Sequence, residues 1–335
     1  MVSAERSFAE NSAPDVRVER IGDGPIISPT SDPSVGHNIQ GPSVIRVPEW
    51  VADPLGRFYL YFADHKGGHI RLAYADTVDG LWTVYAPGAL QLAESHFPTE
   101  EIDLDDETFE RIRARWVDEL GRVAPADLRS DLVEPHVASP DVHVDDGRRQ
   151  IVMYFHGLVS LGNQCTRRAV SRDGRTFIAA EPLLGPSYFR VFHYGGWHYA
   201  LVMPGSIRRS ATGVDGFEEG PTLFEPVMRH SAVRVVGDTL EVYWTRAGDS
   251  PERILRSTID LRGDWMDWAE SEPIEILRPE KSWEGADELV EPSLRGAVNT
   301  VVNQLRDPCI LEDDDRTFLF YAGGGESAIG VAELR

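Results

Sequence analysis

Short runs of apolar and aromatic residues, separated by turn residues, recur along most of the chain. Residues 41–82 contain an apolar run, a polar turn, the aromatic run RFYLYF, a glycine turn and the run HIRLAYA, and they end in Asp79-Gly80 and Trp82. Alternating or continuous β-branched and aromatic residues bounded by Gly, Asp and Pro predict β-strands. The pattern therefore predicts three strands joined by tight turns, which is an antiparallel meander.

The same order of signals recurs at residues 139–177, 187–217, 230–261 and 307–334. The last copy ends before an outer strand, and residues 16–30 include a strand-like stretch that could complete it. Five copies of a four-stranded antiparallel sheet predict an all-β fold, a five-bladed β-propeller in which the first strand of each blade lines a central channel. A β-sandwich with irregular strands is the alternative, but the fixed order of the signals favours the propeller.

Helical periodicity is visible in one segment. In residues 99–120, four large apolar residues fall on one helical face behind acidic residues near the start: Phe109, Ile112, Trp116 and Leu120. We therefore expect residues 92–133 to be an insertion between the first two blades, with one amphipathic helix on the rim. With this insertion, residues 1–335 are expected to form a single propeller domain.

Composition and net charge indicate a globular protein and argue against some classes of binding partner. The 335 residues are 41% hydrophobic and 26% charged, as in ordinary globular proteins, so a sizeable core is expected. A net charge of -22 argues against nucleic acid or an anionic membrane as the main partner, because a polyanion would be repelled. We expect a cytoplasmic protein, since no apolar run reaches the roughly 18 residues of a membrane span and residues 1–15 lack the apolar core of a secretory signal.

The ends of the repeats resemble a known superfamily. Two blades open on the strands SPDVHV (139–144) and DPCIL (307–311), and several copies close on Asp-Gly followed by an aromatic residue. Over residues 16–334 this arrangement resembles the five-bladed glycosidases, namely glycoside hydrolase families 43, 32, 62 and 68 and the family 130 phosphorylases. The chain is also similar to uncharacterised bacterial glycosidase-like proteins. The resemblance implies an enzyme that cleaves a small glycoside or oligosaccharide in the central funnel.

Aligning the blade openings shows which side chains should face that funnel. The positions equivalent to Asp307 hold Gly41, Ser139, Tyr188 and His230. The positions two residues later hold Ser43, Asp141, Arg190, Ala232 and Cys309. Side chains two apart on a strand share a face, so both sets should point towards the channel.

The catalytic triad of family 43 does not carry over. The resemblance calls for an Asp opening the first blade as general base, an Asp opening the second as pKa modulator, and a Glu from the third as general acid. This chain has Gly41 in the first place, Ser139 with Asp141 nearby in the second, and no Glu that aligns in the third. A non-catalytic carbohydrate-binding propeller therefore stays open beside a hydrolase, as does a phosphorylase or lyase that uses the same pocket.

Glycoside cleavage needs a proton-donating carboxyl and a second carboxylate about 5 to 9.5 Å away. The leading pair is Asp141 and Asp307, both on inner strands, with Glu291 of the loop into the fifth blade as a third candidate. A carboxylate within SPDVHV needs a partner or water, which favours a site role for Asp141. Asp307 could instead cap a turn and pair with Arg306, and Glu291 could be a surface residue.

Other polar and aromatic residues near the blade openings could bind sugar hydroxyls or carboxylates. Imidazoles, amides, guanidinium forks and aromatic faces all suit such contacts. The candidate substrate-binding residues are Asn38, His136, His143, Tyr188, Arg190, His230, Trp283, Gln304 and Arg306. The arginines could equally neutralise Asp307 and Glu291, Trp283 could pack its loop, and His143 could be structural.

We expect no cofactor and no metal ligands. Cys165 and Cys309 lie in separate strand-like runs, and no pair of histidines has the spacing of a zinc site. The resemblance allows a structural cation in the central channel, held partly by one histidine.

Overall fold

The computed structural model describes residues 16–115 and 128–335, and its strands form five antiparallel sheets. The first blade consists of β2 (Gln40–Arg46), β3 (Phe58–Ala63), β4 (His69–Ala75) and β5 (Thr83–Gln91). The second contains β6 (Val137–Asp145), β7 (Gln150–Ser160) and β8 (Asn163–Ser171). Its outer edge is divided between the short strands β9 (Ile178–Ala179) and β10 (Gly185–Pro186), both paired with β8.

The remaining blades have four strands each. The third consists of β11 (Phe189–Tyr194), β12 (Trp197–Val202), β13 (Ser206–Ser210) and β14 (Glu218–Thr222). The fourth consists of β15 (Met228–Val236), β16 (Thr239–Arg246), β17 (Ile254–Asp260) and β18 (Ile274–Leu277). The fifth consists of β19 (Arg306–Asp313), β20 (Arg316–Gly323), β21 (Ala328–Leu334) and β1 (Val18–Arg20). The prediction of an all-β, five-bladed propeller is confirmed.

The inner strands form a closed ring in the order β2, β6, β11, β15, β19 and back to β2, as their contacts show. One cluster of buried apolar residues fills each space between neighbouring blades. Because both faces of a blade are covered, strands such as β3 are buried at every position and do not alternate between apolar and polar residues.

The strand β1 closes the ring from the other end of the chain. It pairs antiparallel with β21, with Val18 opposite Leu334 and Arg20 opposite Ala332. Arg20 also donates to both carboxylate oxygens of the buried Glu284, at 2.8 and 2.9 Å. The fifth blade therefore depends on residues from both ends of the propeller sequence.

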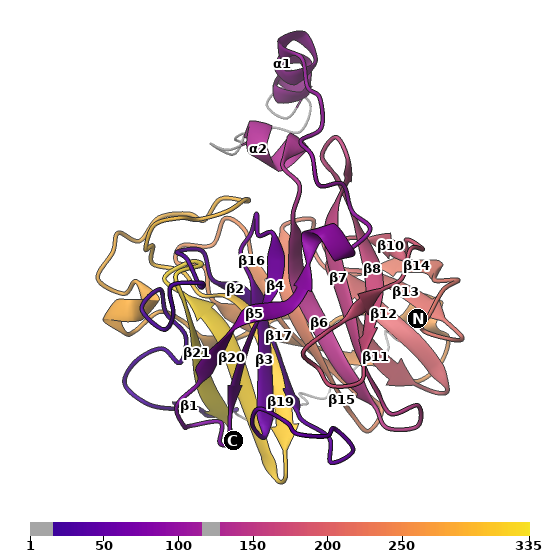
Figure 1. Ribbon diagram of the computed structural model, residues 1–335, viewed down its shortest axis with the longest axis vertical. Helices are drawn as coiled ribbons and strands as arrows, with labels where there is room; N and C mark the ends of the chain where they lie inside the picture. Colours follow the sequence, from indigo (N-terminus) through magenta and orange to yellow (C-terminus); the bar gives the residue numbers. More distant parts are fainter. Residues whose placement is uncertain (1–15, 116–127) are drawn as a thin grey trace, which may run out of the picture.

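Two helices, α1 (Asp106–Ala114) and α2 (Leu128–Val133), follow β5 in the chain and precede β6. They lie at one end of the molecule, where α1 projects from the blades and α2 contacts β7 (Figure 1). Phe109 and Ile112 of α1 pack against the small apolar cluster formed by Leu128, Leu132 and Val133. The sequence predicted a single helix, because the six residues of α2 are too few to show a helical period. Trp116 and Leu120 lie outside the described residues.

Every inner strand opens on a residue with a left-handed backbone. The φ angles are 63° at Gly41, 47° at Ser139, 69° at Tyr188, 44° at His230 and 47° at Asp307. In four blades the strand register also shifts at this point. The five positions that were aligned in the sequence therefore share the same backbone irregularity in the structure. This irregularity interrupts the alternation of side chains along each inner strand.

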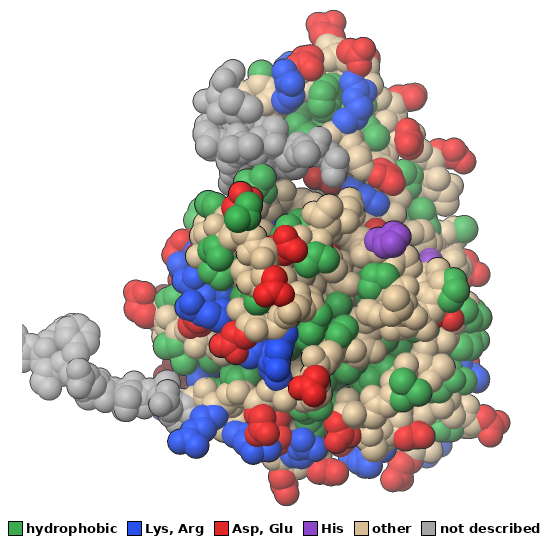
Figure 2. Space-filling view, turned by 90° about the vertical axis from the view of Figure 1, so that its left-hand side faces the viewer, with side chains coloured by type: hydrophobic (Ala, Val, Ile, Leu, Met, Phe, Trp, Pro, Cys, Tyr) green, Lys and Arg blue, Asp and Glu red, His purple; other side chains and the backbone are tan. Residues whose placement is uncertain are grey.

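Acidic side chains are spread over the face of the molecule shown in Figure 2, with basic side chains among them. None of the helices in the described part of the chain is long and apolar enough to cross a membrane.

Candidate functional site

The central channel contains two cavities. The upper cavity, about 230 Å³, lies where the inner strands begin and is bordered by α2. The lower cavity, about 900 Å³, lies between the second halves of the inner strands. Tyr188 lines the upper cavity and Arg190 the lower one, and the Arg190 guanidinium carbon is 4.0 Å from the centre of the Tyr188 ring. This contact separates the two cavities.

Three neutral imidazoles and a tyrosine form part of the lining of the upper cavity, together with His65, whose pKa is raised by Glu326 although burial opposes this. The ring centres lie 6.2 Å apart for His136 and His156, 6.2 Å for His156 and Tyr188, and 5.8 Å for Tyr188 and His230. Burial lowers the pKa of His136 to about 3 and holds the pKa values of His156 and His230 well below the usual value. These rings are therefore uncharged at neutral pH, when an imidazole can both donate and accept a hydrogen bond.

Asp307 lies behind this lining and is 1% exposed. The Tyr188 hydroxyl donates to Asp307 Oδ1 at 2.7 Å, and His230 Nε2 is 4.0 Å from the same oxygen. Among the described residues, Oδ2 has no hydrogen-bond partner. Burial and the nearby negative charge of Glu326 raise the pKa of Asp307 to about 6. This carboxyl therefore changes charge close to neutral pH.

Two buried ion pairs support the floor of the upper cavity. Arg229 donates to both oxygens of Glu252, at 2.9 and 2.8 Å, and Arg306 Nη1 donates to Glu326 at 2.8 Å. Each arginine directly precedes the left-handed residue of its blade. Glu252 lies just before β17 and Glu326 just before β21, which are the third strands of the fourth and fifth blades. Both of these acids are paired with arginines, whereas Asp307 has no arginine or lysine in direct contact among the described residues.

Three predicted substrate-binding residues belong to this buried network. Asn38 Nδ2 donates to Glu326 at 2.7 Å, and Gln304 Oε1 accepts from Arg306 Nε at 3.0 Å. Of the described residues, Asn38, Gln304 and Arg306 are not among those that line either cavity. Their polar groups are used within this buried network, so a direct contact of these side chains with a sugar stays a prediction.

Glu252 and Glu326 were not predicted from the sequence to take part in the site. Glu326 lies in the turn GGGES, whose glycines indicate a hairpin and nothing else. The useful signal was the repeat itself, since Arg229 and Arg306 occupy equivalent positions and each has an acid downstream in its own blade. His65, His156, Gln40 and Gln164 also line the upper cavity and were not predicted to bind substrate.

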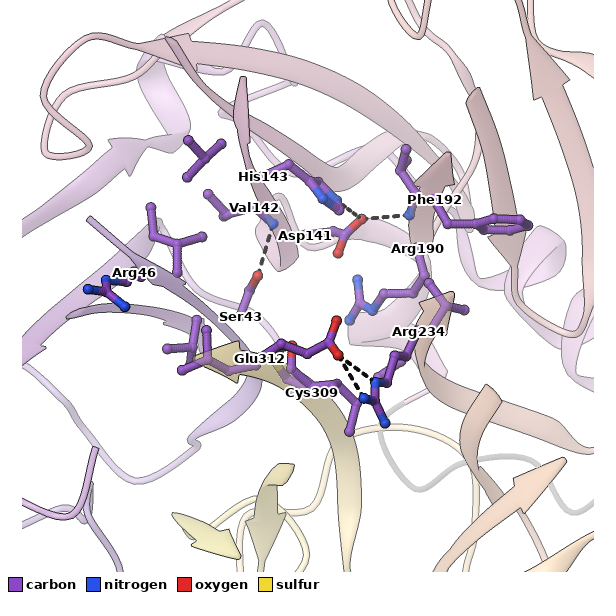
Figure 3. A pocket seen from close by; sticks show the side chains of 18 of the residues that line it. Ser43, Arg46, Asp141, Val142, His143, Arg190, Phe192, Arg234, Cys309 and Glu312 are labelled. Carbon is purple, nitrogen blue, oxygen red and sulfur yellow. Dashed lines mark hydrogen bonds and ion pairs between the residues drawn. The ribbon is translucent and has the colours of Figure 1, made fainter. Parts of the chain in front are cut away.

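Asp141 and His143 line the lower cavity, as Figure 3 shows. Asp141 Oδ2 accepts from His143 Nε2 at 2.8 Å and from the Val191 amide at 2.7 Å. Burial opposes ionisation of Asp141, but His143, Arg190 and the Val191 amide outweigh it, so its pKa lies below the usual value. The predicted pair of Asp141 and Asp307 is thus not brought into one cavity, because the left-handed residues direct the two strand positions to different ends of the channel.

Arg190 is fixed between the cavities by backbone oxygens. Its Nε donates to the Ser231 carbonyl at 2.8 Å, and its Nη1 to the carbonyls of Phe189 and Ser139 at 3.0 and 3.3 Å. Its Nη2 has no partner within the described parts of the chain. Arg190 forms no hydrogen bond with Asp307 in the described chain, although its positive charge still favours the ionised form of that carboxyl.

Two predicted residues lie away from the cavities. Glu291 is exposed on the loop before the fifth blade and, like Trp283, is absent from the described lining of both cavities. The Trp283 ring stacks on Tyr321, with centres 5.8 Å apart and planes at 23°. It also covers Gly330, where a Cβ would lie 2.2 Å from the ring. Trp283 therefore packs its loop on the fifth blade, and its role as a sugar platform stays a prediction.

Within residues 16–115 and 128–335, no group of three or more His, Cys, Asp or Glu side chains is placed to hold a metal ion. Cys165 and Cys309 are both free thiols.

No known family model matches the chain. Its sequence is 34% identical over 323 residues to the uncharacterised protein R118 of Acanthamoeba polyphaga mimivirus, covering 89% of this chain and 83% of the viral protein. The chain belongs to the R118 family. The R118 family therefore includes a protein with the five-bladed propeller fold. Solved structures of other proteins have a similar fold.

One similar structure is CoXyl43, a GH43 β-xylosidase/α-arabinofuranosidase from a compost microbial metagenome in complex with xylotriose, with a TM-score of 0.55, 12% identity and 95% of each chain covered. A GH43_1 enzyme from Xanthomonas citri has a TM-score of 0.56 at 11% identity, covering 93% of this chain and 90% of its own. A member of the GH130 family of mannoside phosphorylases, which contains glycoside hydrolases, has a TM-score of 0.58 at 13% identity, covering 98% and 96%. The resemblance to five-bladed propeller glycosidases is confirmed in fold.

Proposed function

We propose that this R118-family protein is a glycoside-cleaving enzyme that holds a small glycoside or oligosaccharide in the upper cavity. The observation that carries the proposal is Asp307, a buried carboxyl whose pKa is raised to about 6 and which is bonded to Tyr188 of the cavity lining. A carboxyl that titrates near neutral pH can give up and regain a proton during each turnover, as acid–base catalysis requires.

In this proposal Asp307 acts through Tyr188. Protonated Asp307 donates its proton to the Tyr188 oxygen, while the Tyr188 proton passes to the glycosidic oxygen and the bond from that oxygen to the anomeric carbon breaks. A water molecule then attacks the anomeric carbon, and His230, which lines the same cavity but whose pKa is too low to hold the proton, relays it. Return of that proton to Asp307, 4.0 Å from His230, restores the starting state, with water added across the bond.

The fold and the cavity chemistry support a carbohydrate as the substrate. The structures of the Xanthomonas citri enzyme, which shares the fold, hold xylose and xylotriose. Uncharged imidazoles and amides such as Gln40 and Gln164 offer donors and acceptors suited to hydroxyl groups. Asp141 is left out of the reaction because it is an anion bound to His143 in the other cavity.

The test is a screen of aryl xylosides, arabinofuranosides and mannosides, and of short oligosaccharides, with and without phosphate. We expect Asp307→Asn and Tyr188→Phe to lower kcat at least about 100-fold, the usual size of a lost proton-transfer group. The chain offers a matched control: Tyr194 donates to Asp238 at 2.9 Å on the surface, so Asp238→Asn and Tyr194→Phe should retain activity. Full activity of Asp307→Asn would reject the proposed site.

A non-catalytic sugar-binding propeller is the second candidate, favoured by Gly41. A Cβ at this position would lie 3.1 Å from Ser139 Cα, so the acid that opens the first blade in family 43 would fit here only if Ser139 moved by a few tenths of an ångström. Calorimetric binding of a saccharide without any product would identify a binder. A requirement for phosphate would indicate a phosphorylase, and an unsaturated product that absorbs in the ultraviolet would indicate a lyase.

A further inference from the structure

The lower cavity has the size of a ligand site but takes no part in the proposed reaction. Its volume is about 900 Å³, and small-molecule sites typically occupy roughly 300 to 1,000 Å³. All five inner strands contribute to its lining through Ser43, Asp141, Arg190, Ala232 and Cys309. The described linings of the upper and lower cavities have no residue in common. The lower cavity is therefore a separate compartment.

Asp141 and Arg190 are each fixed by hydrogen bonds to the protein, and each keeps one polar atom that forms no hydrogen bond with the described residues. Both donors to Asp141 bind Oδ2, so Oδ1 has no hydrogen bond from the described residues, and the side chain is 14% exposed. Arg190 is 4% exposed, is fixed by three carbonyl oxygens, and keeps Nη2 without a partner in the described chain. Figure 3 shows both side chains directed towards the hollow between the strands. Buried polar groups normally find partners, so these unused positions point to a ligand.

The charges of this cavity favour a neutral ligand. Asp141 and Arg190 carry opposite charges side by side, and at the rim Arg234 Nε donates to Glu312 at 2.8 Å. Ser43 Oγ accepts from the Val142 amide at 2.9 Å, which leaves its own hydrogen free to donate. A ligand hydroxyl can donate to Asp141 and accept from Ser43 or Arg190, whereas an anion or a cation would meet a like charge.

The mouth of the cavity supplies an aromatic surface. Trp50 is half-buried, lines the cavity and is held by a hydrogen bond from its Nε1 to Asp146 at 2.8 Å. A fixed aromatic ring beside polar groups suits a molecule with an apolar face and hydroxyl edges, which describes a sugar ring.

We propose that the lower cavity is a second binding site, which takes a neutral saccharide of one to three rings with Asp141 and Arg190 as its polar anchors and Trp50 as its stacking surface. This site does not depend on the reaction proposed for the upper cavity.

The test is calorimetric titration of the full chain with xylose, mannose and xylotriose, together with inorganic phosphate as an anionic probe. We expect neutral saccharide to bind at a site that Trp50→Ala and Asp141→Asn each weaken at least 10-fold, while phosphate does not bind there. Asp238→Asn, a surface substitution, is the control for Asp141→Asn. Circular dichroism of each variant monitors the fold, and Trp50→Phe, which keeps an aromatic ring, should retain most of the affinity.

The outcomes separate this site from the proposed reaction. If Asp307→Asn abolishes turnover while the site sensitive to Trp50 still binds saccharide, both proposals stand. If turnover is absent from the wild type and that binding persists, the proposed function alone is rejected. The second site is overturned if no saccharide binds, if the only binding is removed by Asp307→Asn, or if folded Trp50→Ala and Asp141→Asn bind as the wild type does.

Discussion

At the scale of single residues, the left-handed backbone at each blade opening decides which side chains reach the channel. Tyr188, His230 and Asp307 hold φ angles of 69°, 44° and 47°, which cost residues with a Cβ on the order of 1 kcal/mol or more. Such strain is commonly kept at functional sites. Aligning the sequence located these positions, but it could not show the backbone reversal, because Tyr carries no preference for a positive φ and the preference of Asp and His is too weak to signal one.

Gly41 should resist replacement by the acid found in family 43. Its φ is 63°, and a Cβ would approach Ser139 Cα to 3.1 Å. We expect Gly41→Asp to lower the free energy of unfolding by roughly 1 to 3 kcal/mol in urea denaturation. Gly24→Asp is the matched control, because nothing lies within 4 Å of a Cβ at Gly24. Equal stability of the two variants would contradict this account.

Asp307 should make stability depend on pH. Its pKa is about 6 in the folded chain and about 4 in an unfolded one, so the folded state holds a proton that the unfolded state releases between these values. The contribution of Asp307 to the free energy of unfolding should therefore fall by about 3 kcal/mol as the pH rises from 4 to above 6, whereas the buried neutral histidines contribute in the opposite direction. In urea denaturation across this range the stability of Asp307→Asn should rise more steeply with pH than that of the wild type, and parallel curves would argue against a raised pKa.

At the scale of elements, the strands were predictable and their irregularities were not. Aromatic runs such as RFYLYF mark buried strands, and the turn residues between them show that neighbours run antiparallel. The divided edge of the second blade was missed because β9 and β10 have two residues each, too few for a pattern. The ion pairs of Arg229 and Arg306 were missed for a different reason: an acid in a turn resembles a solvated surface residue until the fold buries it.

The contact between β1 and the fifth blade rests on a buried carboxylate. Glu284 is fully buried and accepts from Arg20 at 2.8 Å and from the Tyr321 hydroxyl at 2.7 Å. Arg20→Met should cost about 3 kcal/mol of unfolding free energy, because the carboxylate loses its cation inside the protein. Arg262→Met removes the exposed pair with Asp260 and should change stability little. Comparable losses in the two variants would show that burial of Glu284 is unimportant.

At the scale of the whole molecule, repetition was the strongest signal in the sequence. Five similar units without intervening helical periods leave few architectures, and a ring of sheets buries both faces of each blade. The sequence could not predict that the channel is divided by Arg190 and Tyr188, since that depends on side chains meeting across blades. For the same reason it placed Asp141 and Asp307 together.

The closed ring should unfold as one unit. Five apolar clusters each bridge two blades, so loss of one blade exposes two interfaces. A chain that begins at residue 21 lacks β1 and should be less stable and prone to associate through the free edge of β21. Calorimetry and size-exclusion chromatography would compare it with a chain that begins at residue 16. Separate melting of individual blades in the longer chain would contradict a single propeller domain.

The pairing of β1 with β21 also sets the order of events during translation. β1 is synthesised before the other strands of the five blades, whereas its partner at Ala328–Leu334 is synthesised after them. Earlier blades can gather as they emerge, but the nascent chain must keep this short segment unpaired until β21 has been made. A ribosome that stalls late would therefore hold an open ring, with an unprotected sheet edge available to chaperones.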